Sequence, residues 1–338
     1  MPPPLLVIRF SSLGDIVLTT SFLRTLQANH PDQKIFFLTK LAFQDIISFF
    51  PVKVEPLILR PEQSLIDLAG IIRRHQFEKI YDLHQNLRTQ LLRILTFRHF
   101  YSYNKQHWRR RYICFRHIKS PQLHTINLYH SALALDDRPH ISPPPLLVIP
   151  EPPRSNTFCV LIHPGASRPT KAWPITHWID TIQWMITHQL KVSVIGGPAE
   201  NQALNTLLHI FGKQITVYGP QLSLKNLVET IADHQLFLSN DSGPAHIAAA
   251  LSIPQITIFG PTHPSLGFLP QNLQARILSL NLPCSPCTLH GQIHCPRKHH
   301  RCMNELLPEL IIEHIRQLIS SNFPGHTKAS NSASGSIN

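Results

Sequence analysis

Residues 5–17 read LLVIRFSSLGDIV and join an apolar run, a short turn and the start of a helix. The run at residues 5–8 has the length and apolar content of a buried strand. Residues 11–14 form the turn, and from Asp15 onward apolar side chains recur at helical spacing as far as Leu26. A strand that turns directly into a helix is the first half of a βαβ unit, so this stretch predicts a parallel α/β sheet.

The same alternation continues along the chain. In the first half we expect further strands at residues 34–39, 54–59 and 79–83, and helices at residues 65–75 and 87–95. In the second half we expect strands at residues 158–163, 191–195, 215–218, 236–239 and 255–259, and helices at residues 173–188, 200–211, 224–232, 244–251 and 304–319. Strands that alternate with amphipathic helices in two series predict two Rossmann-like α/β domains.

A run of prolines separates the two series. Seven of them lie at positions 139, 143, 144, 145, 150, 152 and 153. They favour an extended linker, with a short strand at residues 146–149. We therefore expect an N-terminal domain at residues 1–150, a C-terminal domain at 151–320 and a disordered polar tail at 321–338. Ligands of such folds bind at the carboxyl ends of the strands, here in the cleft between the domains.

The composition narrows the class of protein. The chain has 338 residues, of which 43% are hydrophobic, enough to bury full cores. No apolar run reaches the length of about 18 residues that a membrane span needs, and the N-terminus does not resemble a signal peptide. We therefore expect a cytoplasmic protein, in which six cysteines do not form a disulfide scaffold.

The net charge of +12 is concentrated in one segment. Residues 88–119 hold nine Lys and Arg side chains and no Asp or Glu. Such a segment attracts polyanions: nucleic acid, anionic lipid or a phosphorylated or carboxylated glycan. An ordinary solvated basic surface explains the same composition equally well.

Three loops at the predicted carboxyl edges could carry chemistry. Asp15 begins the first helix, where it is either an N-terminal cap or a general base that projects into the cleft. Lys171 precedes a helix whose free amides suit a phosphate, although a surface lysine is the plainer interpretation. Residues 240–246, NDSGPAH, either cap a tightly packed helix or hold a diphosphate on the free amides beside Gly243.

A fourth candidate is the cysteine-rich segment. Cys284, Cys287, Cys295 and Cys302 lie within twenty residues, with several histidines between them. Four thiols could bind a structural zinc ion, but the spacing also fits reduced cysteines that pack a compact loop. The chain has no Asp-x-Asp motif, so a transferase here would stabilise a diphosphate leaving group with Lys171 and helix amides.

Taken in order, these stretches resemble glycosyltransferase family 9, the ADP-heptose:lipopolysaccharide heptosyltransferases. The resemblance covers residues 5–319. It rests on RFSSLGDIV at 9–17, YDLHQNLR at 81–88, PGA at 164–166 with KAWP at 171–174, NDSGPAH at 240–246 and FGPT at 259–262. The cysteine-rich segment that ends at Cys302-Met303 also resembles members of this family.

The resemblance implies a GT-B fold and an inverting transfer of heptose from ADP-heptose to a Kdo–lipid A or heptosyl-Kdo–lipid A acceptor, without a metal cofactor. Asp15 would be the catalytic base. The donor would contact Ala166, Ser167, Lys171, Glu200, Asp241, Ser242, Gly243 and His246. We expect acceptor contacts from Ser12, Gly14, His84, Asn86, Arg88, Arg109 and Arg110.

The expected partners follow from this reaction: a nucleotide-sugar donor, a lipid-linked anionic glycan and the cytoplasmic surface of the inner membrane, but not nucleic acid. Three alternatives remain open. They are a family 9 transferase that uses another nucleotide sugar, a non-catalytic GT-B relative that binds glycans, and an α/β protein that binds nucleic acid or another polyanion through residues 88–119. The last does not require Asp15, Lys171 and residues 241–246 together, and its affinity would fall steeply with salt. The presence of Asp15 and Lys171 argues against the non-catalytic relative.

Overall fold

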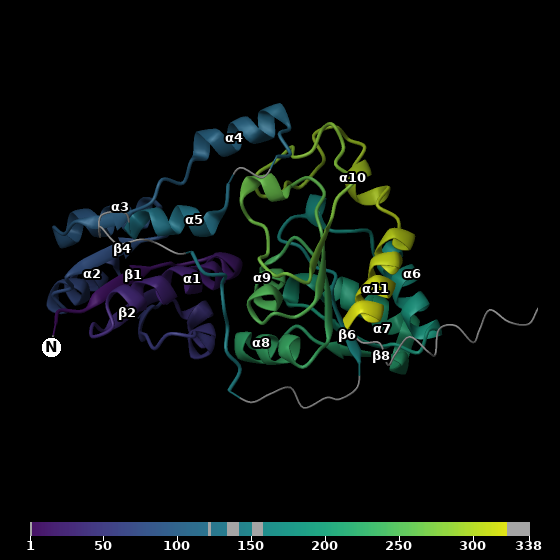
Figure 1. Ribbon diagram of the computed structural model, residues 1–338, viewed down its shortest axis with the longest axis horizontal. Coiled ribbons are helices and arrows are strands. Elements are labelled where there is room, and N and C mark those ends of the chain that lie inside the picture. The colour runs from purple at the N-terminus through teal and green to yellow at the C-terminus, as the bar shows by residue number, and fades with distance from the viewer. Residues whose placement is uncertain (1, 121–122, 134–141, 151–157, 323–338) are drawn as a thin grey trace, which may run out of the picture.

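The structure is a computed structural model that describes residues 2–120, 123–133, 142–150 and 158–322. Two α/β halves lie side by side (Figure 1). Each contains one sheet, ordered β3-β2-β1-β4-β5 in the first half and β11-β10-β9-β6-β7-β8 in the second. The paired strands run parallel, as the sequence predicted.

The N-terminal half follows the predicted alternation closely. Its strands are β1 (Leu5–Ile8), β2 (Ile35–Lys40), β3 (Glu55–Leu59), β4 (Lys79–Asp82) and β5 (Phe100–Ser102). Its helices are α1 (Leu13–Asn29), α2 (Leu65–Arg74), α3 (Leu87–Thr96), α4 (His107–Arg116) and α5 (Thr125–His130), with 3₁₀ turns η1 (Leu41–Phe49) and η2 (Ser131–Leu133). The strand β5 and the helices α4 and α5 were not predicted. β5 and α5, with 3 and 6 residues, are too short to carry a periodic signal, whereas α4 was interpreted only as part of the basic segment 88–119.

The C-terminal half repeats the arrangement. Its strands are β6 (Cys159–His163), β7 (Lys191–Ile195), β8 (Ile215–Tyr218), β9 (Leu236–Asn240), β10 (Gln255–Ile258) and β11 (Ala275–Leu278). Its α-helices are α6 (Ile175–Thr187), α7 (Asn201–Phe211), α8 (Leu224–Ala232), α9 (Gly243–Ala250), α10 (Arg301–Asn304) and α11 (Pro308–Asn322). Its 3₁₀ turns are η3 (Pro169–Lys171), η4 (Pro198–Glu200), η5 (Gly212–Gln214) and η6 (Pro264–Leu266).

Three expectations differ from the structure or fall outside it. Residues 146–149 are not a strand, although two of their amides bond backbone carbonyls of Ala250 and Phe49. The predicted last helix is two helices, α10 and α11, and α11 continues to Asn322. Residues 139–141 and 151–153 of the predicted linker and residues 323–338 of the predicted tail lie outside the described residues.

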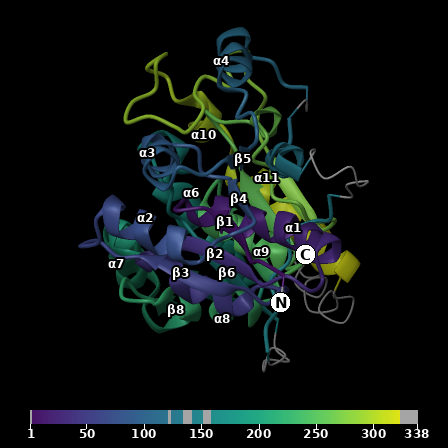
Figure 2. The ribbon, with the colours of Figure 1, turned by 90° about the vertical axis from the view of Figure 1, so that its left-hand side faces the viewer.

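The side chains of β1 alternate between two apolar layers. Leu5 and Val7 pack in the cluster that contains α1, whereas Leu6 and Ile8 pack with α2 and α3. All four are fully buried, which is expected of a central parallel strand covered on both faces. Figure 2 shows this sheet from its own side of the molecule.

One apolar cluster crosses the junction of the two halves. It joins residues of α1, such as Phe22, to residues of α8 and α9, such as Ile231 and Ile247. The N-termini of α1 and α9 meet in this junction. A Cβ atom added to Gly14 would lie 2.5 Å from Cδ2 of His246, and one added to Gly243 would lie 3.2 Å from Cβ of Leu13. Glycine at both positions therefore allows the two helices to approach closely.

This packing predicts the effect of a single methyl group. We expect Gly14→Ala to lower the free energy of unfolding by about 1–3 kcal/mol, because the new methyl group overlaps the His246 ring. Gly70→Ala in α2 is the matched control, because a Cβ atom added to Gly70 would lie 4.0 Å from its nearest neighbour, Nη1 of Arg74. That control is expected to be neutral or to stabilise by up to about 1 kcal/mol. Thermal or urea unfolding of both variants measures the difference, and equal midpoints would contradict the close approach.

Candidate active site

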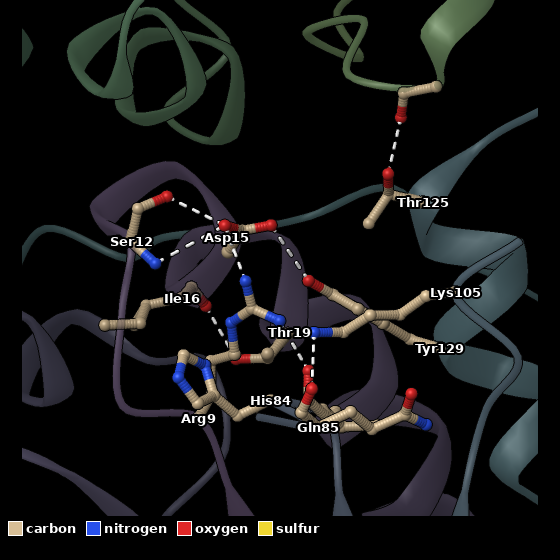
Figure 3. Close-up of polar contacts among 12 residues, drawn as sticks. Arg9, Ser12, Asp15, Ile16, Thr19, His84, Gln85, Lys105, Thr125 and Tyr129 are labelled. Atoms are coloured by element: carbon tan, nitrogen blue, oxygen red, sulfur yellow. Dashed lines mark hydrogen bonds and ion pairs between the residues drawn. The ribbon is translucent and has the colours of Figure 1, made fainter. Parts of the chain in front are cut away.

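Asp15 lies at the start of α1 in a dense polar network (Figure 3). Its Oδ2 atom is 2.5 Å from Nη2 of Arg9, and it accepts hydrogen bonds from Oγ of Ser12 at 2.7 Å and from the Ser12 backbone amide at 3.3 Å. Its Oδ1 atom accepts a hydrogen bond from the Tyr129 hydroxyl at 3.1 Å. The capping interpretation is therefore confirmed. A fifth of the side chain, 19%, remains exposed, so the same carboxylate is accessible to a substrate.

The network keeps this carboxylate ionised. Burial disfavours the charge, but the Arg9 guanidinium and the hydrogen bonds from Ser12 and Tyr129 outweigh it and lower the pKa of Asp15 to about 2. The pKa of an unperturbed Asp is 3.8. Because the folded-state pKa is the lower one, the pair stabilises the fold above about pH 4, and this contribution is lost as the pH falls toward 2.

Arg9 itself is fixed from several sides. Its Nη1 atom donates to the Leu83 carbonyl oxygen at 2.5 Å, and its guanidinium carbon is 5.6 Å from the centre of the Tyr129 ring. Burial opposes its charge, but Asp15 raises the pKa of Arg9 above its usual value. Arg9 therefore holds the Asp15 carboxylate in one orientation.

The second half carries a cationic site at the corresponding edge. Lys171 is 8% exposed, so the interpretation as a surface lysine is wrong. Its Nζ atom is 2.7 Å from Oδ2 of Asp241, which also accepts a hydrogen bond from Oγ1 of Thr262 at 2.8 Å. These residues follow β6, β9 and β10, which are neighbours in the sheet. Their meeting follows from the parallel topology, because the carboxyl ends of neighbouring parallel strands lie at one edge.

Asn240 joins the loops of this site and is fully buried. Its amide donates to the carbonyl oxygens of Pro164 and Gly165 at 2.8 and 3.1 Å, and its Oδ1 atom accepts from the Trp173 amide at 3.0 Å. The loop that carries Lys171 is thus tied directly to the end of β9.

The N-terminus of α9 presents unused polar atoms to this site. Within the described residues, Oγ of Ser242 and Nδ1 of His246 are buried and have no hydrogen-bond partner. A helix N-terminus also carries free amides and a partial positive charge. The edge beside Asp241 can therefore accept an anionic group.

The remaining predicted donor residues surround the same edge. Glu200 accepts a hydrogen bond from the Gly197 amide at 2.8 Å, and its Oε1 atom would lie 2.5 Å from a Cβ atom on Gly165. Ala166 and Ser167 continue the loop after Gly165 and are half-buried and exposed, respectively. The structure thus brings the predicted donor set together on the C-terminal half.

Two histidines connect the two halves of the site electrostatically. Burial lowers the pKa of His246, the carboxylates of Asp241 and Asp15 oppose this shift, and Lys171 adds to it. His290 lies on the cysteine-rich segment. Burial and Lys171 lower the pKa of its ring, and the carboxylates of Asp15 and Asp241 oppose this shift. The close contact of Gly14 with His246 and of Gly243 with Leu13 places the start of α1, with Asp15, beside the start of α9, which follows Asp241.

The predicted acceptor residues divide into two groups. The first group lies beside Asp15 and consists of Ser12, Gly14 and His84. Burial, together with Arg9 and Lys105, lowers the pKa of His84 to about 4, so its ring is neutral at physiological pH. Asn86 caps α3 by accepting from the Thr89 amide at 3.0 Å. The second group lies on the surface, and its exposed members are Arg88 and Arg109.

Arg110 is not part of that exposed surface. It is 6% exposed, its Nη2 atom donates to Oγ1 of Thr125 at 2.9 Å, and its guanidinium carbon lies 4.5 Å from the centre of the Phe268 ring. Thr125 in turn donates to the Gly267 carbonyl oxygen at 2.7 Å. Arg110 therefore connects α4 to the C-terminal half.

The four cysteines of the cysteine-rich segment line one small cavity with His299 and His300. All six cysteines of the chain are free thiols. Burial raises the pKa of Cys287 to about 11 and that of Cys302 to about 12. Within the described residues, no three His, Cys, Asp or Glu side chains are placed to hold one metal ion, so the zinc prediction finds no site there.

This segment supports the Lys171 loop instead. Oγ1 of Thr170 donates to the Gln292 carbonyl oxygen and accepts from the Gln292 amide, both at 2.8 Å. The ring of His300 also contacts the Thr170 carbonyl oxygen at 2.8 Å. Gly291, with φ +83°, lies so close to the Lys171 stem that a Cβ atom there would be 2.9 Å from it.

Sequence reasoning missed four residues of the site: Arg9, Tyr129, Asn240 and His290. Arg9 and Asn240 belong to the motifs at residues 9–17 and 240–246. Their positions at the carboxyl ends of β1 and β9 could have identified them as site residues. Tyr129 and His290 gave none, because each reaches the site through contacts distant in sequence.

Two parallel sheets in halves that meet at the starts of α1 and α9 form the architecture of a GT-B protein. The structure of E. coli ADP-heptose lipopolysaccharide heptosyltransferase II shares this GT-B fold, with a TM-score of 0.75, 22% sequence identity and coverage of 94% of this chain and 99% of that one. Residues 68–296 match the sequence profile of glycosyltransferase family 9 (heptosyltransferase). The chain belongs to glycosyltransferase family 9.

Two curated relatives are named as heptosyltransferases. The lipooligosaccharide heptosyltransferase 2 of Campylobacter jejuni serotype O:6 is 34% identical over 162 residues, which is 46% of this chain and 50% of that protein. The protein of the same name from serotype O:2 is 26% identical over 327 residues, 92% of this chain and 96% of that one. The first match thus spans about half of the relative, whereas the second spans nearly all of it.

Proposed function

We propose that this enzyme transfers heptose from ADP-heptose to the inner core of a lipopolysaccharide, with inversion at the anomeric carbon and without a metal cofactor. The observation that carries the proposal is that the start of α1, which holds Asp15, packs against the start of α9, which follows the Lys171–Asp241 pair: a Cβ atom added to Gly14 would lie 2.5 Å from Cδ2 of His246. A base and an anion site on facing domains are what direct displacement of a nucleoside diphosphate requires. The names of the E. coli and C. jejuni relatives support heptose and lipopolysaccharide.

In this mechanism each half has one task. Asp15 removes the proton from the acceptor hydroxyl as that oxygen attacks the anomeric carbon. Lys171 and the amides at the start of α9 stabilise the departing diphosphate, and Ser242 and His246 supply the polar atoms that lack partners. Because Lys171 is already paired with Asp241, the arriving diphosphate must compete for its charge.

The remaining assignments belong to the same proposal. Ala166 and Ser167 lie against the donor phosphates, Glu200 holds the ribose, and Asp241 contacts the donor sugar. Ser12, Gly14, His84, Asn86, Arg88, Arg109 and Arg110 are proposed to bind the anionic acceptor. Residues 1–150 would bind the acceptor and residues 151–320 the donor, at the cytoplasmic surface of the inner membrane.

A donor screen tests this proposal. The purified protein is incubated with a Kdo–lipid A acceptor or its heptosylated form and, in separate reactions, with ADP-heptose, UDP-glucose and GDP-mannose. We expect transfer from ADP-heptose in the presence of EDTA, and product of inverted anomeric configuration by NMR. Preferred transfer from another nucleotide sugar would favour the first alternative, and tight nucleic-acid binding without transfer would favour the polyanion-binding alternative.

The Arg9–Asp15 pair predicts a change in pH dependence. In the wild type, protonation of Asp15 should not limit kcat/KM above about pH 4, since its pKa is about 2. Arg9→Met removes the cation but keeps a side chain of similar length. Without the cation, burial should raise the pKa of Asp15 by about 1–3. The ionised base is then lost at a higher pH, and an acid limb should appear in the kcat/KM profile. Arg73→Met on the exposed side of α2 is the control; identical profiles for all three proteins would contradict the prediction.

A further inference from the structure

Large apolar side chains are exposed on two consecutive helices of the N-terminal half. Among the described residues, sixteen large apolar side chains are exposed, and seven of these lie between positions 87 and 115. They are Leu87, Leu91 and Ile94 of α3, Phe97 at its end, and Trp108, Tyr112 and Phe115 of α4. Phe97, Trp108 and Phe115 are 87%, 82% and 78% exposed. Single exposed apolar residues are ordinary, but a group of this density indicates an interaction surface.

The spacing places each set on one face of its helix. Residues 87, 91 and 94 of α3 and residues 108, 112 and 115 of α4 follow the same i, i+4, i+7 pattern. The buried residues of α4, Arg110 and Ile113, lie on the opposite side of that helix by the same periodicity. Ile113 packs against Leu266 of the C-terminal half. The apolar face of α4 is therefore turned away from the protein.

The charge around these residues has one sign. Exposed arginines flank both stripes, namely Arg88, Arg93 and Arg98 on or beside α3 and Arg109, Arg111 and Arg116 on α4. No Asp or Glu occurs between residues 88 and 119. The guanidinium carbon of Arg111 lies 5.7 Å from the centre of the Trp108 ring. Aromatic and aliphatic side chains bordered by arginine match the composition of helices that lie in the interface of an anionic bilayer.

We infer that the exposed faces of α3 and α4, the α3–α4 face, dock this enzyme on an anionic lipid bilayer by inserting Trp108, Tyr112, Phe115 and Phe97 among the headgroups. Arginine charge and partial insertion act together in such binding. None of the helices among the described residues has the length and hydropathy of a membrane span. The inference deepens the proposed function, since it rests on an acceptor that is anchored in the same bilayer.

The position of α4 links this surface to the active site. The helix extends from the N-terminal half toward the loops of residues 260–300 (Figures 1 and 2). Its inward residue Arg110 contacts Thr125 and Phe268. Burial lowers the pKa of Arg110, Arg9 lowers it further, and Asp15 opposes the shift. A bilayer on the outward face of α4 would thus lie across this one helix from the contacts that Arg110 makes with Thr125 and Phe268.

Vesicle flotation of the full-length protein tests the inference. We expect the wild type to float with phosphatidylcholine–phosphatidylglycerol vesicles and, weakly or not at all, with phosphatidylcholine alone. Trp108→Ser/Phe115→Ser should reduce the partition coefficient at least about tenfold. Arg111→Gln/Arg116→Gln should reduce it about tenfold or more at low salt. Leu208→Ser/Ile210→Ser on α7 is the matched control, because both side chains are 46% exposed but distant from the face; it should bind like the wild type.

Activity toward a soluble acceptor separates this inference from the proposed function. The Trp108→Ser/Phe115→Ser variant should keep wild-type kcat/KM with a delipidated Kdo oligosaccharide and lose activity only with acceptor in vesicles. Absence of heptose transfer by the wild type would defeat the proposed function and leave the flotation result standing. Wild-type protein that does not float with anionic vesicles, equal flotation of all variants, or variants that abolish self-association instead of flotation would each overturn the inference.

Discussion

Asp15→Asn is expected to bind donor with wild-type affinity and to lose turnover by about 10²- to 10⁴-fold. Removal of a general base typically costs this much. The amide cannot accept the acceptor proton, whereas the proposed donor contacts lie on the other half of the protein. Single-turnover transfer and calorimetric titration with ADP measure the two quantities separately.

Stability must be measured in the same variant, because the substitution leaves Arg9 buried opposite a neutral amide. Loss of one partner from a buried ion pair costs about 3–5 kcal/mol, so the unfolding midpoint should fall. Ser12→Ala is the matched control. It removes the 2.7 Å hydrogen bond to Asp15 but keeps the base, so turnover should fall much less. A folded Asp15→Asn protein with near wild-type turnover would remove Asp15 as the base.

Lys171→Met is expected to weaken ADP binding by at least about tenfold and to lower kcat/KM for the donor by about 10²- to 10³-fold. Removal of one group that stabilises developing negative charge has effects of this size. The variant also leaves the Asp241 carboxylate buried, with the hydrogen bond from Thr262 but without its cation, so the site becomes repulsive to a diphosphate.

The partner variant separates charge from contact. Asp241→Asn frees the Lys171 cation, so ADP affinity should stay the same or increase, whereas kcat/KM for the complete nucleotide sugar should fall because the contact to the sugar is lost. Equilibrium binding of ADP and steady-state kinetics with the nucleotide sugar measure both effects. If the two variants weakened ADP binding equally, Lys171 would not be the residue that binds the phosphates.

The fold could be predicted because its signals are local. Apolar runs of strand length followed by helical periodicity located nearly every long element to within a few residues, as β1 and α1 show. The meeting of the proposed donor residues Lys171 and Asp241 has a related explanation. Lys171 and Asp241 follow strands that are neighbours in a parallel sheet, so topology alone brings them to one edge.

The partners of Asp15 could not be predicted in this way. Tyr129 reaches Asp15 from 114 positions away, on a helix of six residues.

Arg110 belongs to a run of three arginines that the sequence does not distinguish. Only Arg110 lies on the inward side of α4, and this position buries it. The four cysteines, by contrast, gave a plausible metal spacing, but spacing says nothing about whether the thiols point to one centre.

The apolar cluster shared by α1, α8 and α9 has a consequence for how the molecule can fold and move. This cluster is continuous across the junction, so pulling the two halves apart would expose apolar side chains of α1, α8 and α9 to water. Halves that share buried apolar surface are expected to unfold together rather than one after the other. A movement of one half against the other is expected to cost least when it slides along this shared surface rather than opening it.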